Sequence, residues 1–552
     1  MSASTGAGTR GVVRSKKVSI RLGPVARAAA DAHVPGLVEE HVARRLAGRD
    51  ADLWGPTAVD EASKRLGWVD LPRTAGALVP QIIELRDELA DEGVDRVVLC
   101  GMGGSSLAPE VITATDGVPL VVLDGTDPHQ VARAIGTDIE RTVVVVSSKS
   151  GSTVETDSQR RAFEAAFRAA GIEPTTRMVA VTDPGSPLQD LAVDAGYRRV
   201  FSADPEVGGR YSALTAFGLV PAGLAGADIS ALIEQAAAIA PSLAGDSPDN
   251  PALVLGAALG GTDPLRDKIV LVDDGSGLVG FGDWAEQLIA ESTGKQGTGL
   301  LPVVVASADA PEAASPSADT LVVRLCGPDS EPDPGRAEVT VSGTLGAQMQ
   351  LWETATAVAG RLLGINPFDQ PDVESAKAAT RQLLDQGTTG EQPPAFTDGA
   401  VDVRGTQGLL EGVDTLDGAL AALLDRLDPE RGYVAVMAYL DRESDAGLAG
   451  LRAPLARRCG RPVTFGWGPR FLHSTGQYHK GGPATGVYLQ ITGTDGAGED
   501  VEVPGRPFTF GQLIAAQAAG DAQVLAEHGR PVLRLNLTDR ARGIEQLLSL
   551  VG

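Results

Sequence analysis

The feature that most constrains this chain is a series of short apolar runs that alternate with helical or glycine-rich segments. Four runs stand in the first half of the chain, and they read RVVLC, PLVVLD, TVVVVS and MVAVTD, at residues 96–100, 119–124, 142–147 and 178–183. Runs of this length, rich in Val and Leu, are typical of strands that are buried on both faces. Strands that alternate with helices predict a parallel sheet covered on both sides. The predicted fold class is therefore α/β.

The same pattern continues beyond these runs, and the chain of 552 residues is long enough for two or three domains. Turn-rich GDSPDN (245–250) and TTGEQPPAFTDGA (388–400) are the candidate boundaries. We expect four regions: a helical N-terminal region with a disordered start, a first parallel-sheet domain, a second one with a long helix, and a C-terminal α/β region, at 1–90, 91–245, 250–387 and 400–552.

Charge and cysteine content exclude several classes of protein. A net charge of −25 argues against nucleic-acid binding, which needs a basic face, although a few cations can still bind one small anion. The three cysteines have no metal-ligand spacing and fit a reducing compartment. No segment reads as a membrane span or a signal peptide. We expect a cytoplasmic protein without metal, membrane or nucleic-acid partners.

Glycines follow the first strand, in GMGGSS (101–106), and open a helix. Glycine lets the backbone approach a ligand closely, and a helix N-terminus offers free N–H groups. Ser106 stands where a dinucleotide fingerprint needs its third glycine, and no Gly-Lys-Ser/Thr of a P-loop follows. The turn is either an anion site, with Gly104, Ser105 and Ser106 as ligands, or simply a tight strand–helix connection.

A second turn, SSKSGST (147–153), ends another strand of the same predicted sheet. Ligands of parallel sheets lie outside the carboxyl ends of the strands, so the two turns could hold one phosphate between them. The candidate donors of the second turn are the hydroxyls and one ammonium group, namely Ser148, Lys149, Ser150, Ser152 and Thr153. The alternative for each hydroxyl is helix capping.

Five motifs in one order give a resemblance to a known family. They are GMGGSSLAPE, SSKSGSTVET, EVGGRYSALTAFGL (206–219), QLIAESTGK (287–295) and NPFDQPDVESAK (366–377). Together they resemble the phosphoglucose isomerase family, and in particular the branch with a long C-terminal extension that is related to the isomerase part of transaldolase/isomerase fusions. The resemblance implies two sugar-isomerase (SIS) domains plus a C-terminal α/β extension, a homodimer and no cofactor. It also implies interconversion of glucose 6-phosphate and fructose 6-phosphate through a cis-enediol.

The resemblance also implies residue roles. Glu291 matches the base that carries a proton between C1 and C2, a task that suits a carboxylate. Arg210 matches the cation beside the enediolate, Lys377 the lysine near the sugar ring, and Gln287 and Gln370 polar binding positions. Glu374, one turn before Lys377, could hold the lysine side chain. Other interpretations stay open: Glu291 could pair with Lys295 on a helix surface, Arg210 could be buried against a carboxylate such as Glu206, and Lys377 could be an ordinary exposed lysine on a helix.

The ring-opening histidine is harder to place. The family has it between the glutamate and lysine motifs, but no histidine lies between Glu291 and Lys377. FLHSTGQYHKGGP (471–483), after the lysine motif, is similar to the family element. We predict that His479 opens the ring, with His473 as the alternative and a structural loop histidine as a third interpretation. The sequence leaves open whether this histidine acts within its own subunit.

Three rival functions compete with this interpretation. A phosphomannose or dual-specificity isomerase would have the same fold and differ in pocket shape around C2. A sugar-phosphate sensor could keep the phosphate turns but lose the catalytic groups, whereas Glu291, Arg210 and Lys377 are all present. A nicotinamide-dependent oxidoreductase is disfavoured by the incomplete glycine pattern.

Overall fold

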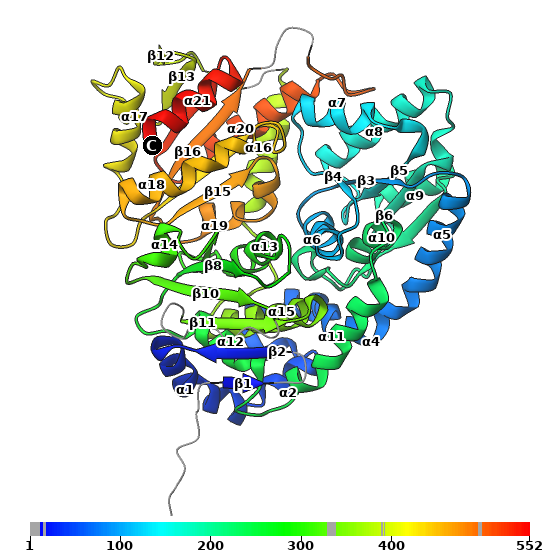
Figure 1. Ribbon diagram of the computed structural model, residues 1–552, viewed down its shortest axis with the longest axis vertical. Helices are drawn as coiled ribbons and strands as arrows, with labels where there is room; N and C mark the ends of the chain where they lie inside the picture. The colour runs from blue at the N-terminus through cyan, green and yellow to red at the C-terminus, as the bar shows by residue number, and fades with distance from the viewer. Residues whose placement is uncertain (1–11, 15–17, 328–337, 388–389, 391, 495–498) are drawn as a thin grey trace, which may run out of the picture.

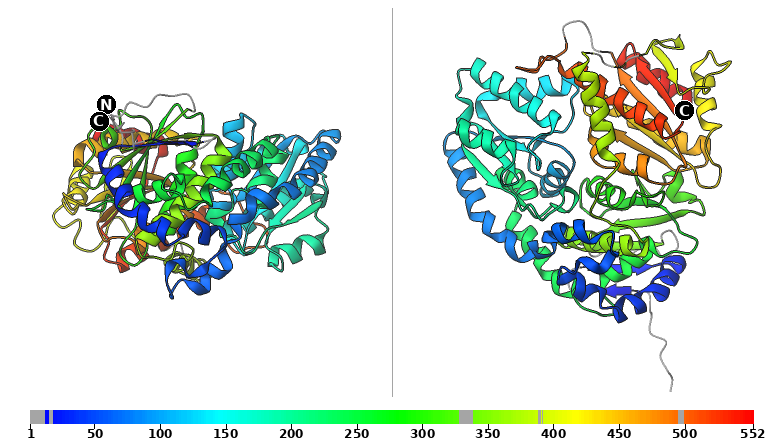
Figure 2. Two further views of the ribbon diagram at one scale, coloured as in Figure 1. Left: turned by 90° about the horizontal axis from the view of Figure 1, so that it is seen from below. Right: turned by 180° about the vertical axis from the view of Figure 1, so that it is seen from behind.

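Three sheets, each with its own helices, make three lobes in the computed structural model (Figures 1 and 2). The structure describes residues 12–14, 18–327, 338–387, 390, 392–494 and 499–552. The predicted disordered start falls outside these residues. Parallel strands dominate all three sheets, which confirms the α/β fold class. No helix in the described part of the chain is long and apolar enough to cross a membrane.

The first sheet is entirely parallel, in the order β4-β3-β5-β6-β7. Its strands are β3 (Arg96–Gly101), β4 (Val121–Leu123), β5 (Thr142–Ser147), β6 (Met178–Thr182) and β7 (Arg199–Ser202). Gly101 pairs with Ser147 at the carboxyl ends of β3 and β5, so the two polar turns leave the sheet side by side. The helices of this lobe are α6 (Leu107–Asp116), α7 (Pro128–Gly136), α8 (Val154–Ala169), α9 (Pro187–Ala195) and α10 (Ala216–Leu224). The next helix, α11 (Ile229–Leu243), packs mainly against α15 (Leu345–Leu362) of the second lobe.

The second sheet has the order β1-β2-β11-β10-β8-β9. Its parallel strands are β8 (Lys268–Asp274), β9 (Leu301–Val305), β10 (Thr320–Cys326) and β11 (Val339–Gly343). Its helices are α12 (Pro251–Gly260), α13 (Phe281–Thr293), α14 (Pro311–Ala314) and α15 (Leu345–Leu362). Glu291 lies on α13, which packs between β9 and α15.

The N-terminal region contains five α-helices and, ahead of them, two short strands within the described residues. Its helices are α1 (Pro24–Glu39), α2 (Val42–Ala47), α3 (Val59–Arg65), α4 (Leu71–Thr74) and α5 (Val79–Asp91). Two strands precede them, β1 (Val12–Arg14) and β2 (Val18–Leu22), and β2 joins the edge of the second sheet antiparallel to β11. The alternation in β2, with Val18 and Ile20 buried, is the period-2 pattern of a strand.

The third sheet has the order β12-β13-β17-β16-β14-β15. The parallel strands are β14 (Tyr433–Tyr439), β15 (Val463–Trp467), β16 (Gly486–Gly493) and β17 (Val532–Leu537), and β12 (Phe396–Asp398) and β13 (Val401–Gly405) add an antiparallel edge. The helices are α16 (Val373–Asp385), α17 (Leu416–Leu424), α18 (Arg452–Cys459), α19 (Gly476–Gly481), α20 (Phe510–Glu527) and α21 (Arg540–Val551).

Buried ion pairs join the third lobe to both of the others. Arg461 bonds to Asp319 of the second lobe at 2.5 Å, and Arg470 bonds to Asp124 of the first at 2.8 Å. α16 packs closely along α20, where the backbone of Gly520 meets that of Thr380. The third lobe is therefore packed against the other two, and in Figure 1 it lies above the second lobe and beside the first.

Candidate active site

The glycine turn after β3 forms the base of the candidate site. Gly104 packs so tightly that a Cβ atom there would lie 2.1 Å from the carbonyl oxygen of Gly209, so no other residue fits. Ser212 closes the contact by donating to the carbonyl of Gly104 at 3.1 Å. A Cβ on Gly103 would lie 2.8 Å from that of His473. The turn thus holds together the segments that carry Arg210 and His473.

Glu291 and Arg210 meet above this turn. Both side chains are buried, and Arg210 Nε lies 3.6 Å from Glu291 Oε2. Gln287, one helical turn before Glu291, donates to the same carboxylate oxygen at 3.1 Å. Arg210 Nη2 donates to Gln370 Oε1 at 3.1 Å. The structure therefore brings four of the predicted residues into one cluster, with one carboxylate facing one guanidinium.

The alternative pairings for these residues do not form. Lys295 bonds to Asp369 at 2.7 Å rather than to Glu291. Burial, followed by the charge of Arg210, lowers the pKa of Lys295 to about 8. Glu206 accepts a hydrogen bond from Arg49 at 2.9 Å rather than from Arg210. Lys295 therefore anchors the loop that delivers Gln370 instead of neutralising Glu291.

The second turn gathers its hydroxyls at the N-terminus of α8. Ser148 and Thr153 hydroxyls lie 3.1 Å apart, as do those of Ser150 and Ser152. Thr153 occupies the N-cap position of α8, but its side chain makes no capping hydrogen bond. Lys149 bonds to Asp183 at 2.5 Å, so its charge is already paired. Apart from Lys149, the turn offers hydroxyl donors and a helix N-terminus to an anion.

Ser105 and Ser106 lie on the facing turn, after the strand that pairs with β5. Both are buried, and the hydroxyl of Ser106 donates to the carbonyl of Gly103 at 3.1 Å. With β3 and β5 paired up to Gly101 and Ser147, the two turns share one edge of the sheet.

His473 reaches this cluster from the third lobe. Its carbonyl accepts from Gln287 Nε2 at 2.8 Å, and its ring Nε2 lies 3.2 Å from Glu155 Oε1. Glu155 is buried in the first turn of α8, directly after the hydroxyl turn. Burial raises the pKa of Glu155, but the hydrogen bond and charge of His473 and the charge of Lys377 outweigh it and lower that pKa overall. The pair is thus a carboxylate held against an imidazole.

His479, the predicted ring-opening residue, lies in an aromatic environment. Its ring is fully buried among Tyr433, Tyr488 and Phe471, with ring centroids 5.3–6.3 Å away. Neither ring nitrogen has a hydrogen-bond partner within the described part of the chain. Burial, then the charges of Lys480 and Arg530, lower the pKa of His479 well below its ordinary value. The structure does not bring this histidine to the Glu291 cluster.

Lys377 lies on α16 at the edge of the site. Its side chain is 40 % exposed and bonds to Glu374 at 2.8 Å. Its charge nevertheless acts on the buried Glu155. The lysine therefore combines solvent access with a favourable charge effect on Glu155.

Two residues at the site were missed by the sequence reasoning. Glu155 lies inside the motif SSKSGSTVET, so the resemblance could have pointed to it. Gln517 lies on α20 and donates to Glu155 at 2.8 Å, and no pattern in the sequence marks it. Among the described residues, no group of three or more His, Cys, Asp or Glu is arranged to hold a metal ion.

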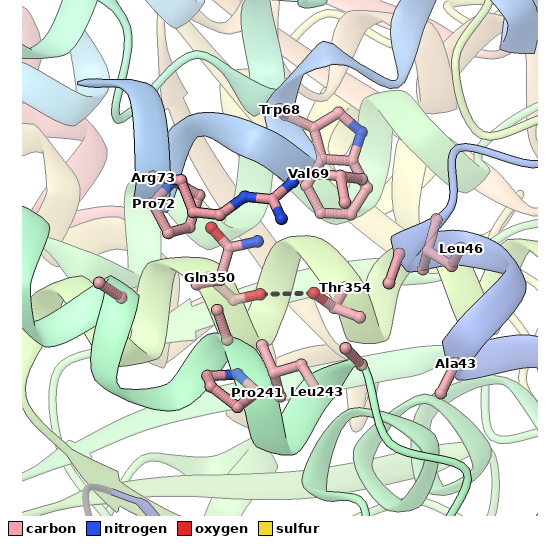
Figure 3. Close-up of a pocket in the computed structure, with 14 residues that line it drawn as sticks. Ala43, Leu46, Trp68, Val69, Pro72, Arg73, Pro241, Leu243, Gln350 and Thr354 are labelled. Carbon is pink, nitrogen blue, oxygen red and sulfur yellow. Dashed lines mark hydrogen bonds between the residues drawn. The ribbon is translucent and has the colours of Figure 1, made fainter. Parts of the chain in front are cut away.

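A separate apolar pocket of about 240 Å³ lies between α2, α11 and α15 (Figure 3). Leu46, Trp68, Pro241 and Leu243 line it, and its polar lining side chains include Arg73, Gln350 and Thr354. Trp68 stacks on Tyr211, the neighbour of Arg210, at a centroid distance of 5.0 Å. A pocket with so few polar groups suits a sugar phosphate poorly, so the polar cluster is the better candidate site.

Comparisons with known proteins show which proteins this chain resembles. The model of the family described as "Phosphoglucose isomerase" matches residues 88–264. A glucose-6-phosphate isomerase of Rubrobacter xylanophilus is 30% identical over 382 residues, which cover 57% of this chain and 88% of that protein. A probable glucose-6-phosphate isomerase of Natronomonas pharaonis is 29% identical over 405 residues, 63% of this chain and 92% of the relative.

Solved structures show similar folds. A hypothetical protein of Thermus thermophilus superposes with a TM-score of 0.56 at 28% identity, and the match covers 66% of this chain and 99% of that one. A glucose-6-phosphate isomerase of Chlamydia trachomatis superposes with a TM-score of 0.55 at 20% identity, over 68% of this chain and 90% of that one. The second likeness is one of fold alone.

Proposed function

The chain belongs to the phosphoglucose isomerase family, and we propose that it interconverts D-glucose 6-phosphate and D-fructose 6-phosphate through a cis-enediol. The names of its relatives support this reaction. The observation that carries the proposal is the placement of Glu291 against Arg210 and Gln287, beside two turns suited to a phosphate. An aldose–ketose isomerase needs that combination of a base, a cation and an anchored phosphoester.

Glu291 is the proposed proton shuttle. A carboxylate can take a proton from one carbon and return it to its neighbour, and general-base help of this kind contributes typically about 10²–10⁴-fold. Arg210 supplies positive charge where the enediolate oxygens form, and one such preorganised donor contributes roughly 3–4 kcal/mol to the transition state. Four contacts to the 367–370 loop hold its guanidinium in place, so little reorganisation accompanies the reaction.

The two turns are the proposed phosphate anchor. Ser148, Ser150 and Thr153 supply hydroxyls, and the N-terminus of α8, a helix of 16 residues, favours negative charge. Gly104 keeps the opposite turn close to the cluster. Anchoring the phosphoester fixes C1 and C2 of the sugar relative to Glu291, and this orientation lowers the entropic cost of the reaction.

Ring opening is assigned to His473 rather than to His479. Moving a proton from the O1 hydroxyl to the ring oxygen needs a group that both accepts and donates. His473 lies at the cluster with Glu155 as its partner, whereas His479 has an apolar surrounding that disfavours a charged ring. Lys377, whose charge also lowers the pKa of Glu155, is the second proposed participant.

A homodimeric assembly and a cytoplasmic location belong to the same proposal. Both follow from the resemblance and from the sequence composition. Light scattering of the purified protein and fractionation of the producing cells test them directly.

The test of the proposed reaction is the Glu291→Gln variant in a coupled assay of glucose 6-phosphate formed from fructose 6-phosphate. The amide has the same shape but cannot accept a proton from carbon, so we expect kcat to fall about 10³-fold or more. Glu353→Gln is the matched control, because Glu353 is also a buried helical glutamate and contacts none of the cluster residues by a hydrogen bond. Activity of Glu291→Gln within tenfold of the wild type would overturn the assignment.

A further inference from the structure

The third lobe reaches the site with a second group besides His473. We propose that Gln517 is a positioning residue that holds Glu155 against His473, which makes the third lobe a working part of the active site of its own chain. This inference rests on the ring-opening role proposed above for the Glu155–His473 pair.

Three hydrogen bonds in series carry the proposal. Thr126 Oγ1 donates to Gln517 Oε1 at 2.7 Å, Gln517 Nε2 donates to Glu155 Oε1 at 2.8 Å, and the same carboxylate oxygen lies 3.2 Å from His473 Nε2. Thr126, Gln517 and Glu155 are 0, 2 and 5 % exposed. Because an ionised carboxylate only accepts hydrogen bonds, the NH2 side of the Gln517 amide must face Glu155, which leaves the amide oxygen to accept from the hydroxyl of Thr126.

The fold brings these groups together from three places. Thr126 follows β4 at the carboxyl edge of the first sheet, Glu155 lies in the first turn of α8, and Gln517 lies in the middle of α20. Asp521, one turn further along α20, accepts from Lys480 at 2.6 Å. Residues four apart share a helix face, so one face of α20 holds both Glu155 and the segment that carries His473.

A buried carboxylate needs donors to stay ionised and to keep one orientation. The charges of His473 and Lys377 lower the pKa of Glu155. Burial, then Asp521 and to a smaller degree Glu155, raise the pKa of the Tyr439 phenol. Gln517 adds a neutral hydrogen-bond donor, whose strength does not change with pH because an amide does not ionise in this range. It directs Oε1 between the amide and the imidazole, which fixes the imidazole for transfer of a proton to the sugar ring.

Gln517→Leu is the central variant, since leucine keeps the volume and removes the donor. A hydrogen bond to a charged group contributes about 1.5–3 kcal/mol, so ring opening should slow about 10- to 100-fold. The step is separated by comparing fructose 6-phosphate with 5-deoxyfructose 6-phosphate, which lacks O5 and cannot close a ring. We expect Gln517→Leu to lower the turnover of fructose 6-phosphate at least about tenfold and that of the 5-deoxy analogue less than about twofold.

The acid limb of the pH profile on fructose 6-phosphate is the second readout. Loss of the donor raises the pKa of Glu155, so the limb should move to higher pH in Gln517→Leu. Thr126→Val keeps Gln517 but frees its amide and should give the same changes to a smaller degree. Gln490→Leu is the matched control, because Gln490 is a buried glutamine that donates to the carbonyl of Ala518 on α20.

The outcomes separate the inference from the function on which it rests. If His473→Ala leaves the ratio of the two substrates at its wild-type value, the ring-opening role fails. If His473→Ala changes that ratio while Gln517→Leu, folded by circular dichroism, does not, only the positioning role fails. The positioning role is also overturned if Gln517→Leu loses activity on both substrates equally, or if its effects match those of Gln490→Leu.

Discussion

Two histidines of the third lobe, six residues apart, lie in opposite environments. His473 faces a carboxylate and the Glu291 cluster, whereas His479 faces three aromatic rings. His479 follows the motif likeness more closely, but His473 has the chemical partners. The difference shows that an imidazole becomes a proton-transfer group through its neighbours, and that likeness of a short motif does not supply them.

The largest expected effect comes from exchanging each histidine in turn. His473→Ala removes the proposed acid–base group and should lower kcat on fructose 6-phosphate by about 10²–10⁴-fold. His479→Phe keeps an aromatic ring in an aromatic cage and should stay within about threefold of the wild type, because it touches no reacting group. Steady-state rates on both variants decide the comparison. A large loss in His479→Phe with an intact His473→Ala would return the role to His479.

A mixture of two inactive variants tests whether the His473 and Glu291 of one active site belong to the same chain. Glu291→Gln and His473→Ala would be unfolded together and refolded, so that any dimers that form include mixed ones with one chain of each variant. Because one chain brings His473 to its own Gln287 and Glu155, we expect the mixture to show no more activity than the two variants alone. Refolded wild type is the control for recovery. Restored activity would mean that the histidine acts across a subunit interface.

The charge of Lys377 gives a smaller and pH-dependent effect on the His473 pair. Lys377 helps to lower the pKa of Glu155, so Glu155 is ionised at neutral pH and loses its charge as the pH falls through that lowered pKa. Lys377→Met should raise the pKa of Glu155 and move the acid limb of activity to higher pH. Lys377→Arg keeps the charge and should keep the limb in place. If the acid limb of Lys377→Met stays where it is in the wild type, the charge of Lys377 does not affect the titration of Glu155 in the active enzyme.

The alternation of strands and helices was enough to predict the α/β fold, because buried parallel strands are plain in runs such as TVVVVS. The edge strand β2 was missed because five residues ahead of a helical region carry little signal. Glu291, Arg210, Gln287 and Gln370 could be selected because each falls in a motif, and the structure joins them.

The third lobe shows why the rest could not be predicted. Gln517 meets Glu155 across 362 positions of sequence, and a single buried glutamine in a helix has many ordinary explanations. His473 and His479 stand in equally polar stretches, and only the packing of the third sheet decides which one is enclosed. Contacts of this kind are set by tertiary structure, which local periodicity does not record.

The smallest effect concerns His479 and stability rather than activity. Its pKa in the fold lies well below the ordinary value of 6.5, so the folded protein keeps the ring neutral while the unfolded chain takes up a proton below that pH. Stability is therefore lost as the pH falls below 6.5, by about 1.4 kcal/mol for each pH unit until the folded pKa is reached. His479→Phe removes this term, so its unfolding free energy relative to the wild type should rise as the pH is lowered through that range and stay constant above it. Denaturant unfolding of both proteins at several pH values measures the difference, and a difference that does not depend on pH would show that the His479 ring is not held neutral.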